Sequence, residues 1–314
     1  MARNILNDSG FSADQLASVE DGLGCMNCPT STEVLITNNF VNDVRRIIGS
    51  NAYGIDRGTG VVAAKTIPQA SGSSIIVVNG EVTADLDHDH LSRLLAHESG
   101  HALLDQRDED NPDTRSTWMG DRVLQSLAAT AIEEYRVEKA VYANGFGLAD
   151  EVDWTGAGDL ATEMNMAVIH AVVVEEKNKT SPEELSSDIA AVHDWSSKKL
   201  AYIAAAIDSG ALPATEAVPA EHRVDWDDYV KDTWTHRLNR YRAIPDAATP
   251  MSSSDRRRAA DRLLTVERHF LKSMGFYYKQ VGRSWGFFRI KNDRLFDTRL
   301  KRAVRFAEAR HSGD

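Results

Sequence analysis

The sequence predicts an α+β fold that is predominantly helical, with a small β-sheet in the first half of the chain. Two short runs rich in β-branched residues occur before residue 80, and helical periodicity dominates after the turn at 144–147. The chain has 314 residues, of which 42% are hydrophobic and 26% charged, which is typical of a globular protein with a full core. We expect a first domain over residues 1–150 and a helical C-terminal lobe over residues 151–314.

The predicted elements follow one another in a simple order. Short helices are expected at 12–23 and 41–48, and strands at 61–67 and 74–78. Longer helical periods then cover 91–106, 120–143, 160–176, 182–208, 225–242 and 255–274. Prolines lie in the loops between the last three of these helices, as expected for segments that interrupt helical structure.

The helix expected at 91–106 contains the most informative motif of the chain, His97-Glu98-Ser99-Gly100-His101. In an α-helix, positions i and i+4 lie on the same face, so both imidazoles can ligate one metal ion. Glu98 then projects beside the metal, where a water molecule can bind. Zinc lowers the pKa of such a water, and a glutamate can accept its proton. The motif predicts His97 and His101 as ligands of Zn²⁺ and Glu98 as the general base.

The residues around the motif favour a buried metal site. Apolar residues flank it at 94–96 and 102–104, and a helix this apolar is buried, so its histidines need polar partners. Gly100 lowers helix stability, which favours a close approach of another element or of substrate at this point. The alternative is a solvated helix in which His and Glu fall into this spacing by chance.

A third metal ligand is expected downstream of the motif. Leu104 and Arg107 stand where another class of zinc enzymes has a glycine and a histidine, which excludes that class. Asp105 lies a full turn beyond His101, so we expect it to support the site or to end the helix. The helix at 120–143 offers better candidates, because its apolar stripe passes close to two carboxylates.

Helix phase distinguishes the glutamates of that helix. Glu138 falls near the centre of the apolar stripe and Glu134 close to its edge, whereas Glu133 points to the opposite side. Buried carboxylates need a cation, and a zinc ion would supply it, so we expect Glu134 as third ligand. Glu138 is then expected to hydrogen-bond a ligand imidazole. Two alternatives stay open: a solvated face paired with Arg136 and Lys139, or Glu133 as the ligand or as a supporting carboxylate.

These residues resemble those of a known group of zinc enzymes. The His97–His101 pair with a glutamate on a later helix is similar to the gluzincins, zinc metallopeptidases whose third ligand is a glutamate. The run 134–138 resembles the glutamate helix of HtpX-like and CAAX-protease peptidases, with Glu138 in place of their aspartate. The run 132–138 is also similar to the I-E-D-x-R-x-E stretch of uncharacterised bacterial and phage zincin-like proteins. The resemblance covers about residues 70–143.

The resemblance implies a zincin-like metallopeptidase domain over 1–150, with a peptide or protein as substrate. It also implies that the strand at 74–78 lies beside the cleft and pairs with an extended substrate. A further hydrogen-bond donor is needed to stabilise the tetrahedral oxyanion. The candidates for this donor are Tyr135, His236, Tyr241, Tyr277 and Tyr278.

Two alternative functions use the same residues. One is a regulatory or defence-associated protease that is specific for one protein target. The other is a non-catalytic interaction protein that zinc stabilises and that binds a partner through a basic tail at 251–314. This tail has 16 Lys and Arg against 7 Asp and Glu, so the rest of the chain has 20 against 40. The tail either packs on the acidic body or forms a basic surface for nucleic acid, although no nucleic-acid motif is present.

The compartment and the role of the cysteines follow from weaker signals. No apolar run reaches membrane-spanning length and no signal peptide is visible, so we expect a cytoplasmic protein without membrane contact. The two cysteines, Cys25 and Cys28, are too few for a four-cysteine zinc ribbon, and we expect two ordinary thiols. The alternatives are a redox pair, a thiolate that caps the catalytic zinc, or a second zinc site completed by His88 and His90.

Overall fold

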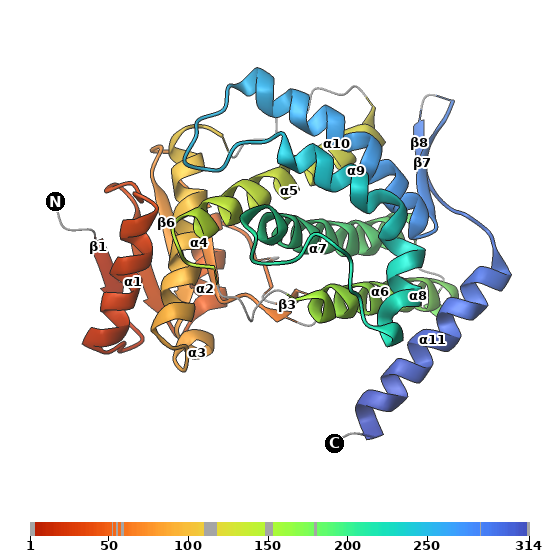
Figure 1. The fold of residues 1–314 in the computed structure, drawn as a ribbon, viewed down its shortest axis with the longest axis horizontal. Helices are drawn as coiled ribbons and strands as arrows, with labels where there is room; N and C mark the ends of the chain where they lie inside the picture. Colours follow the sequence, from red (N-terminus) through yellow and green to blue (C-terminus); the bar gives the residue numbers. More distant parts are fainter. Residues whose placement is uncertain are drawn as a thin grey trace.

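The computed structural model describes residues 4–51, 53–54, 56–57, 60–109, 118–147, 153–178, 181–282 and 284–312. It confirms the predicted fold class, because helices dominate and a small sheet lies at the N-terminal end of the molecule (Figure 1). Within this part of the chain, no helix is both long enough and apolar enough to cross a bilayer.

The main sheet has the strand order β1-β2-β6-β5. Its strands are β1 (Asn4–Asn7), β2 (Glu33–Thr37), β5 (Ala64–Pro68) and β6 (Ser74–Asn79). The first three in spatial order are parallel, and β5 is antiparallel to β6. Parallel pairs need crossover connections, and α1 (Ala13–Cys25) joins β1 to β2, while α2 (Phe40–Ile48) follows β2. Strands β1 and β2 were not among the predicted elements.

The expected place of the strand at 74–78 beside the cleft is wrong. This segment is β6, which pairs with β2 on one side and with β5 on the other, so it has no free edge for a substrate. The reason is that β2 pairs with the edge of β6 that lies opposite β5, so both edges of β6 are occupied. The edge strands are β1 and β5. Strand β5 matches the other predicted strand at 61–67 and contacts α4 (His88–Gln106).

Helices cover both faces of this sheet. On one face, α1 and α4 pack together over the alternating apolar side chains of β2 and β6, among them Val34 and Ile76. On the other face, α2 packs with Phe40 and Val44 against Leu35 and Val77. This alternation is the period of two expected for strands that are covered on both sides. The sheet therefore gives α4 a rigid support.

The remaining helices form the larger part of the molecule. They are α5 (Met119–Ala143), α6 (Trp154–Asn178), α7 (Pro182–Ser209), α8 (Ala220–Tyr229), α9 (Lys231–Arg242) and α10 (Ser253–Ser273). Helices α5 and α7 cross the centre, with α6 and α8 below them and α9 and α10 above (Figure 1). All six contribute to one hydrophobic core. The domain boundary predicted at residue 150 stays a prediction.

The helix predicted at 225–242 is two helices, because the chain breaks at Val230 between α8 and α9. The break lets Trp226 and Trp234 both pack edge-to-face on Trp154. The shorter elements are α3 (Gly80–Thr83) and the two-residue strands β3 (Asp56–Arg57) and β4 (Gly60–Val61).

The basic tail is folded and makes several ion pairs with the acidic part of the chain. After α10 it forms a hairpin of β7 (Phe276–Val281) and β8 (Ser284–Arg289) and then α11 (Asp293–Ser312). Arg302 contacts Asp225 at 2.9 Å and Asp228 at 2.6 Å, and Arg289 contacts Glu176. These contacts favour the interpretation that the tail packs on the acidic body.

Candidate metal centre

The motif helix α4 is held against α5 by a very close approach. A Cβ atom added to Gly100 would lie 2.7 Å from Cγ1 of Val137, which is far inside ordinary contact. The close approach of another element, expected at this glycine, is therefore confirmed. It brings the side chains of the two helices near enough to share one ion.

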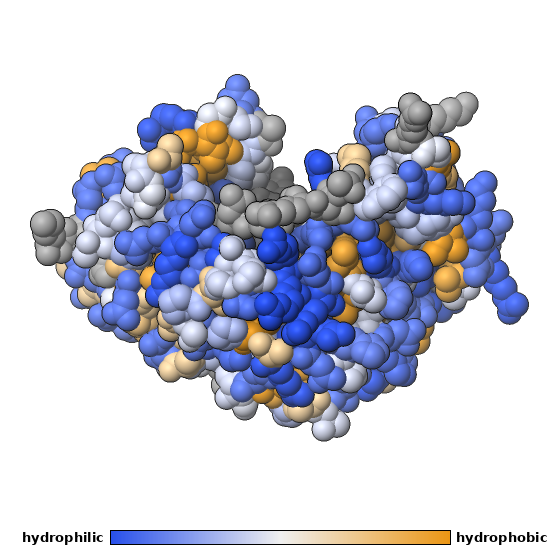
Figure 2. Space-filling view, turned by 90° about the horizontal axis from the view of Figure 1, so that it is seen from above, coloured by the Kyte–Doolittle hydropathy of each residue, from blue (hydrophilic) through white to orange (hydrophobic). Residues whose placement is uncertain are grey.

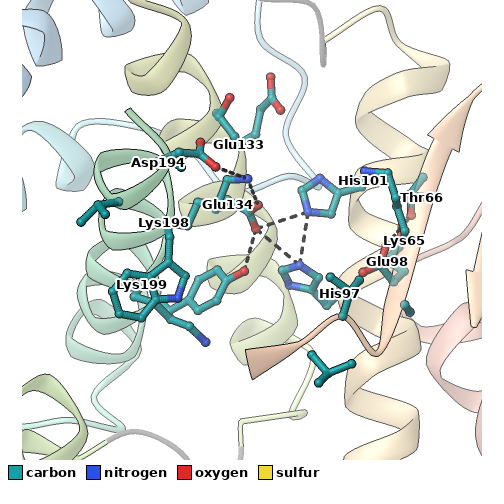
Figure 3. Close-up of a pocket in the computed structure, with 18 of the residues that line it drawn as sticks. Lys65, Thr66, His97, Glu98, His101, Glu133, Glu134, Asp194, Lys198 and Lys199 are labelled. Atoms are coloured by element: carbon teal, nitrogen blue, oxygen red, sulfur yellow. Dashed lines mark hydrogen bonds and ion pairs between the residues drawn. The ribbon is translucent and has the colours of Figure 1, made fainter. Parts of the chain in front are cut away.

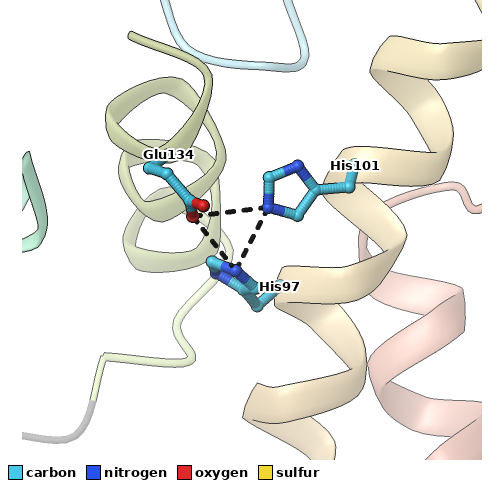
Figure 4. A group of neighbouring side chains, drawn as sticks. All are labelled: His97, His101 and Glu134. Atoms are coloured by element: carbon cyan, nitrogen blue, oxygen red, sulfur yellow. Dashed lines mark hydrogen bonds and ion pairs between the residues drawn. The ribbon is translucent and has the colours of Figure 1, made fainter. Parts of the chain in front are cut away.

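Three side chains from these helices meet at one point (Figure 4). Nε2 of His97 lies 3.2 Å from Nε2 of His101, and Oε2 of Glu134 lies 3.4 Å from each of these nitrogens. A tetrahedral zinc ion with bonds of about 2.0–2.1 Å places its ligand atoms about 3.3 Å apart. The three atoms therefore fit one face of a zinc coordination tetrahedron.

A buried carboxylate fixes the orientation of the first histidine. Glu138 accepts a hydrogen bond from Nδ1 of His97 at 2.7 Å, and its other oxygen accepts a hydrogen bond from the guanidinium of Arg93 at 2.6 Å. This network assigns the proton to Nδ1, which turns the lone pair of Nε2 toward His101 and Glu134. The structure thus places Glu138 at the imidazole of His97, as expected from the helix phase.

The electrostatics of the cluster also favour a bound cation. Burial lowers the pKa of His97, but hydrogen bonds to Glu134 and Glu138 outweigh it and raise the pKa to about 10. Burial raises the pKa of Glu134, but His101 and His97 hold it well below its usual range. In the absence of a metal the cluster therefore retains a proton, and a divalent cation can take the place of that proton.

Glu98 directly follows His97 on α4, and its side chain contacts strand β5 of the sheet. Its Oε2 accepts a hydrogen bond from Oγ1 of Thr66 at 2.7 Å, and the Thr66 hydroxyl also lies 2.9 Å from the Glu98 carbonyl. The Glu98 side chain is 7% exposed and lines the same cavity as the three clustered residues. The edge strand β5 therefore holds the carboxylate that the motif predicts as the general base.

The cluster opens into a cavity of about 1070 Å³ (Figure 3). Strand β5 and helices α4 and α5 line one side, and α6 and α7 line the other. Further lining residues are Lys65 of β5, Met166 and His170 of α6, and Trp195, Lys198 and Lys199 of α7. Its volume lies just above the range of about 300–1,000 Å³ that is typical of small-molecule sites, which leaves room for a segment of peptide.

Tyr202 of α7 is a neighbour of the cluster that sequence reasoning missed. Its hydroxyl donates to Oε2 of Glu134 at 3.0 Å, and its ring packs edge-to-face on His97. Burial and the charge of Glu134 raise its pKa well above the usual value, so it stays protonated. A signal was present, because Asp194, Lys198 and Tyr202 recur at intervals of four residues and form a polar stripe on a largely apolar helix.

The five residues predicted as oxyanion donors do not line this cavity. Tyr135 donates to Asp208 and stacks on Tyr241 in the core, and Tyr278 lies beside Ser186. His236 is exposed on α9. Residue type alone does not indicate which helices face the cluster, and these five residues lie on faces or elements that point elsewhere.

Two further carboxylates line the cavity near the cluster, those of Glu133 and Asp105. The expectation that Glu133 points to the opposite side is therefore wrong. Adjacent helix positions differ by only about 100°, and the cavity is wide enough to receive both Glu133 and Glu134. Glu133 nevertheless lies outside the three-atom cluster. Asp105 accepts a hydrogen bond from the hydroxyl of Ser74.

The cysteines lie away from the cluster. Cys25 is half-buried, and burial raises its pKa to about 11, which disfavours a thiolate. Cys28 is buried in the apolar layer between α1 and the sheet. His90 forms a hydrogen bond with Asp87, and His88 forms one with Ser18. Within the described ranges, the only three-residue group with metal-ligand spacing is that of His97, His101 and Glu134, so the second zinc site is not formed there.

Comparisons of the chain with models of known protein families, with curated proteins and with solved structures found no match. The geometry and chemistry of the site are therefore the basis on which a function can be inferred.

Proposed function

We propose that this protein is a zinc-dependent metallopeptidase that hydrolyses peptide bonds in a peptide or protein substrate. The observation that carries the proposal is the triangle of His97, His101 and Glu134, which opens into a cavity that Glu98 also lines. Structural zinc sites are closed by four protein ligands, whereas catalytic sites use three and keep one position open. The described residues supply three, which favours a catalytic site over a purely structural one.

The residues around the cluster fit distinct steps of hydrolysis. A bound zinc ion supplies a Lewis acid and lowers the pKa of a water molecule. Glu98 accepts a proton from the attacking water at its carboxylate and then donates it to the leaving amine. Thr66 holds that carboxylate at 2.7 Å, so its position is set before substrate arrives.

Tyr202 is the best-placed donor for the oxyanion. Its protonated hydroxyl lies beside the ligand cluster, 3.0 Å from Oε2 of Glu134. A rotation of the hydroxyl proton toward the substrate carbonyl would stabilise the negative charge that develops on that oxygen. Lys198, with Nζ 3.9 Å from Oε1 of Glu134, adds a positive charge to the same wall of the cavity.

The proposal is tested by incubating zinc-loaded protein with a complex peptide mixture and with native cell extract, and by identifying new termini by mass spectrometry. The variant is Glu98→Gln, and the matched control is Glu20→Gln, an exposed glutamate on α1. We expect equal zinc content in all three proteins and cleavage lower by about 10²–10⁴-fold in Glu98→Gln alone. Cleavage confined to one extract protein would indicate the target-specific protease. Undiminished cleavage by Glu98→Gln, or none by the wild type, would overturn the proposal.

A further inference from the structure

A second cavity, of about 320 Å³, lies where α9 ends and α10 begins. It shares no lining residue with the cavity of the metal centre. Three arginines line it, Arg240 from α9 and Arg258 and Arg262 from the first turns of α10. The rest of its lining is mostly apolar and comes from Ala243, Ile244, Pro245, Pro250, Met251 and Ala259.

The charges around this cavity are unbalanced. The one carboxylate that lines the cavity is that of Asp255. It accepts a hydrogen bond from the hydroxyl of Ser252 at 2.7 Å and lies 3.6 Å from the guanidinium of Arg258. Among the residues that the structure describes, Arg240 and Arg262 contact no carboxylate. Three positive charges around one concavity raise the local potential and attract an anion.

The neighbouring basic residues behave differently. Arg256, in the same basic run, is used within the fold, because it donates to the carbonyls of Asp108 and Met251. Arg268 on the same helix pairs with Asp121 at 2.6 Å. The positive charges of Arg240, Arg258 and Arg262, in contrast, lie at the small cavity. Figure 2 views the molecule from the side on which α10 lies, and strongly hydrophilic side chains gather near the centre of that face.

The floor of the cavity is built before any ligand binds. The loop 243–252 that forms it is held to α5 by Arg136, whose guanidinium donates to the carbonyl of Thr249 at 2.8 Å and whose carbonyl accepts from the amide of Ala247 at 2.9 Å. Lys139 donates to the carbonyl of Ile244 at 3.2 Å. Arg136 is itself buried and paired with Glu109. A preformed floor lowers the ordering cost of binding.

We propose that this cavity binds a small phosphate-bearing molecule with a flat aromatic body, as in a nucleoside phosphate. Guanidinium groups match phosphate oxygens in geometry as well as in charge. The apolar floor of Ile244, Pro245 and Met251 suits the flat body, and the volume lies at the small-molecule end of the range for binding sites. The confined size favours such a molecule over a nucleic acid strand, which would need a continuous basic surface.

The test is calorimetric titration of the zinc-loaded protein with ADP, pyrophosphate and a short single-stranded DNA. The variants are Arg258→Gln/Arg262→Gln and, as control, Arg305→Gln, an exposed arginine on α11 outside the cavity. We expect ADP to bind more tightly than pyrophosphate, and the double variant to weaken ADP binding at least 10-fold while the control leaves it unchanged. All three variant positions are exposed, so folding is retained and is checked by thermal unfolding.

The arginine dependence also separates this cavity from the metal centre. If ADP binds with its phosphates at the zinc ion, the double variant will bind ADP as tightly as the wild type. That result would overturn the proposal. Absence of ADP binding by the wild type would overturn it as well. Tighter binding of the DNA, weakened equally by Arg305→Gln, would assign the positive charge to a nucleic acid surface instead.

Discussion

Oε1 of Glu138 lies 2.7 Å from Nδ1 of His97, so a carboxylate buried in α5 orients an imidazole on α4. The same carboxylate accepts a hydrogen bond from Arg93 of α4, and Glu138 is only 2% exposed. Metal-bound histidines commonly use such a partner to fix the tautomer and raise the basicity of the ligand nitrogen. The contact therefore links the packing of two helices to the chemistry of the cluster.

Replacement of Glu138 by glutamine should weaken zinc binding by about 10–100-fold, because the neutral amide is a weaker acceptor for Nδ1 of His97. The dissociation constant is measured by competition with a chromophoric chelator. Glu183→Gln, an exposed position at the start of α7, serves as the control and should bind zinc like the wild type. Equal affinities for all three proteins would show that the His97 contact does not tune the metal.

Glu134 and Glu133 should differ sharply when each is replaced by glutamine. Only Glu134 has an oxygen within 3.4 Å of both histidine nitrogens, so its loss should lower zinc affinity more than the 10–100-fold typical of an indirect partner. Glu133→Gln should retain one zinc per chain. Zinc loss from the Glu133 variant alone would reverse the assignment of the third ligand.

Gly100→Ala should destabilise the protein and impair zinc binding. The helix propensity of alanine would contribute about 1 kcal/mol of stability, but overpacking against Val137 costs about 1–3 kcal/mol and separates α4 from α5. Adding Val137→Ala removes the two closest atoms that the new Cβ would meet and should restore zinc binding. Urea unfolding and zinc titration of the single and double variants check this coupling, and a zinc affinity unaffected by Gly100→Ala would contradict it.

Tyr202→Phe should lower kcat while zinc content stays at one per chain. Loss of one oxyanion donor typically costs about 10²–10³ in kcat, and the phenyl ring keeps the edge-to-face contact with His97. Tyr241→Phe, in the core and outside the cavity, is the control. If both variants lose the same small fraction of kcat, Tyr202 has only a packing role.

The metal-free protein should lose stability as the pH rises from 6.5 toward 10. Burial lowers the pKa of His97, but Glu134 and Glu138 raise it to about 10, against 6.5 in the unfolded chain. The folded state therefore holds a proton that the unfolded chain releases, so this stabilisation is complete below pH 6.5 and lost through pH 10. Urea unfolding of chelator-treated protein measures it. The wild type should lose more stability across this range than Glu138→Gln, and equal pH profiles would show that the carboxylate of Glu138 does not raise the pKa of His97.

Sequence periodicity predicted much of this arrangement because its signals are local. The phase of the helix at 120–143 placed Glu134 and Glu138 on the side of the apolar stripe, where the structure brings them to the two histidines. Gly100 indicated a close approach because a glycine inside a helix has a cost that packing must justify. Both inferences need only the geometry of a single helix.

The features that sequence reasoning missed depend on contacts between distant segments. Tyr202 meets Glu134 across 68 positions of sequence, and the polar stripe on its own helix does not indicate that this helix covers the cluster. Strand β1 has only four residues, two of them asparagine, so its signal is weak until β2 pairs with it. Strand β5 is the edge strand beside α4, and the contact of its Thr66 with Glu98 also joins segments 32 positions apart in the sequence.

The central claim, a zinc ion held by His97, His101 and Glu134 with one position open, is tested most directly by X-ray absorption spectroscopy of the purified protein at known zinc stoichiometry. We predict one zinc per chain, with nitrogen and oxygen neighbours at about 2.0–2.1 Å and imidazole scattering from two histidines. The imidazole signal should halve in His101→Ala loaded with zinc. A sulfur shell at about 2.3 Å, which would indicate ligation by Cys25 or Cys28, or zinc content unchanged when His97 and His101 are both replaced by alanine, would contradict the claim.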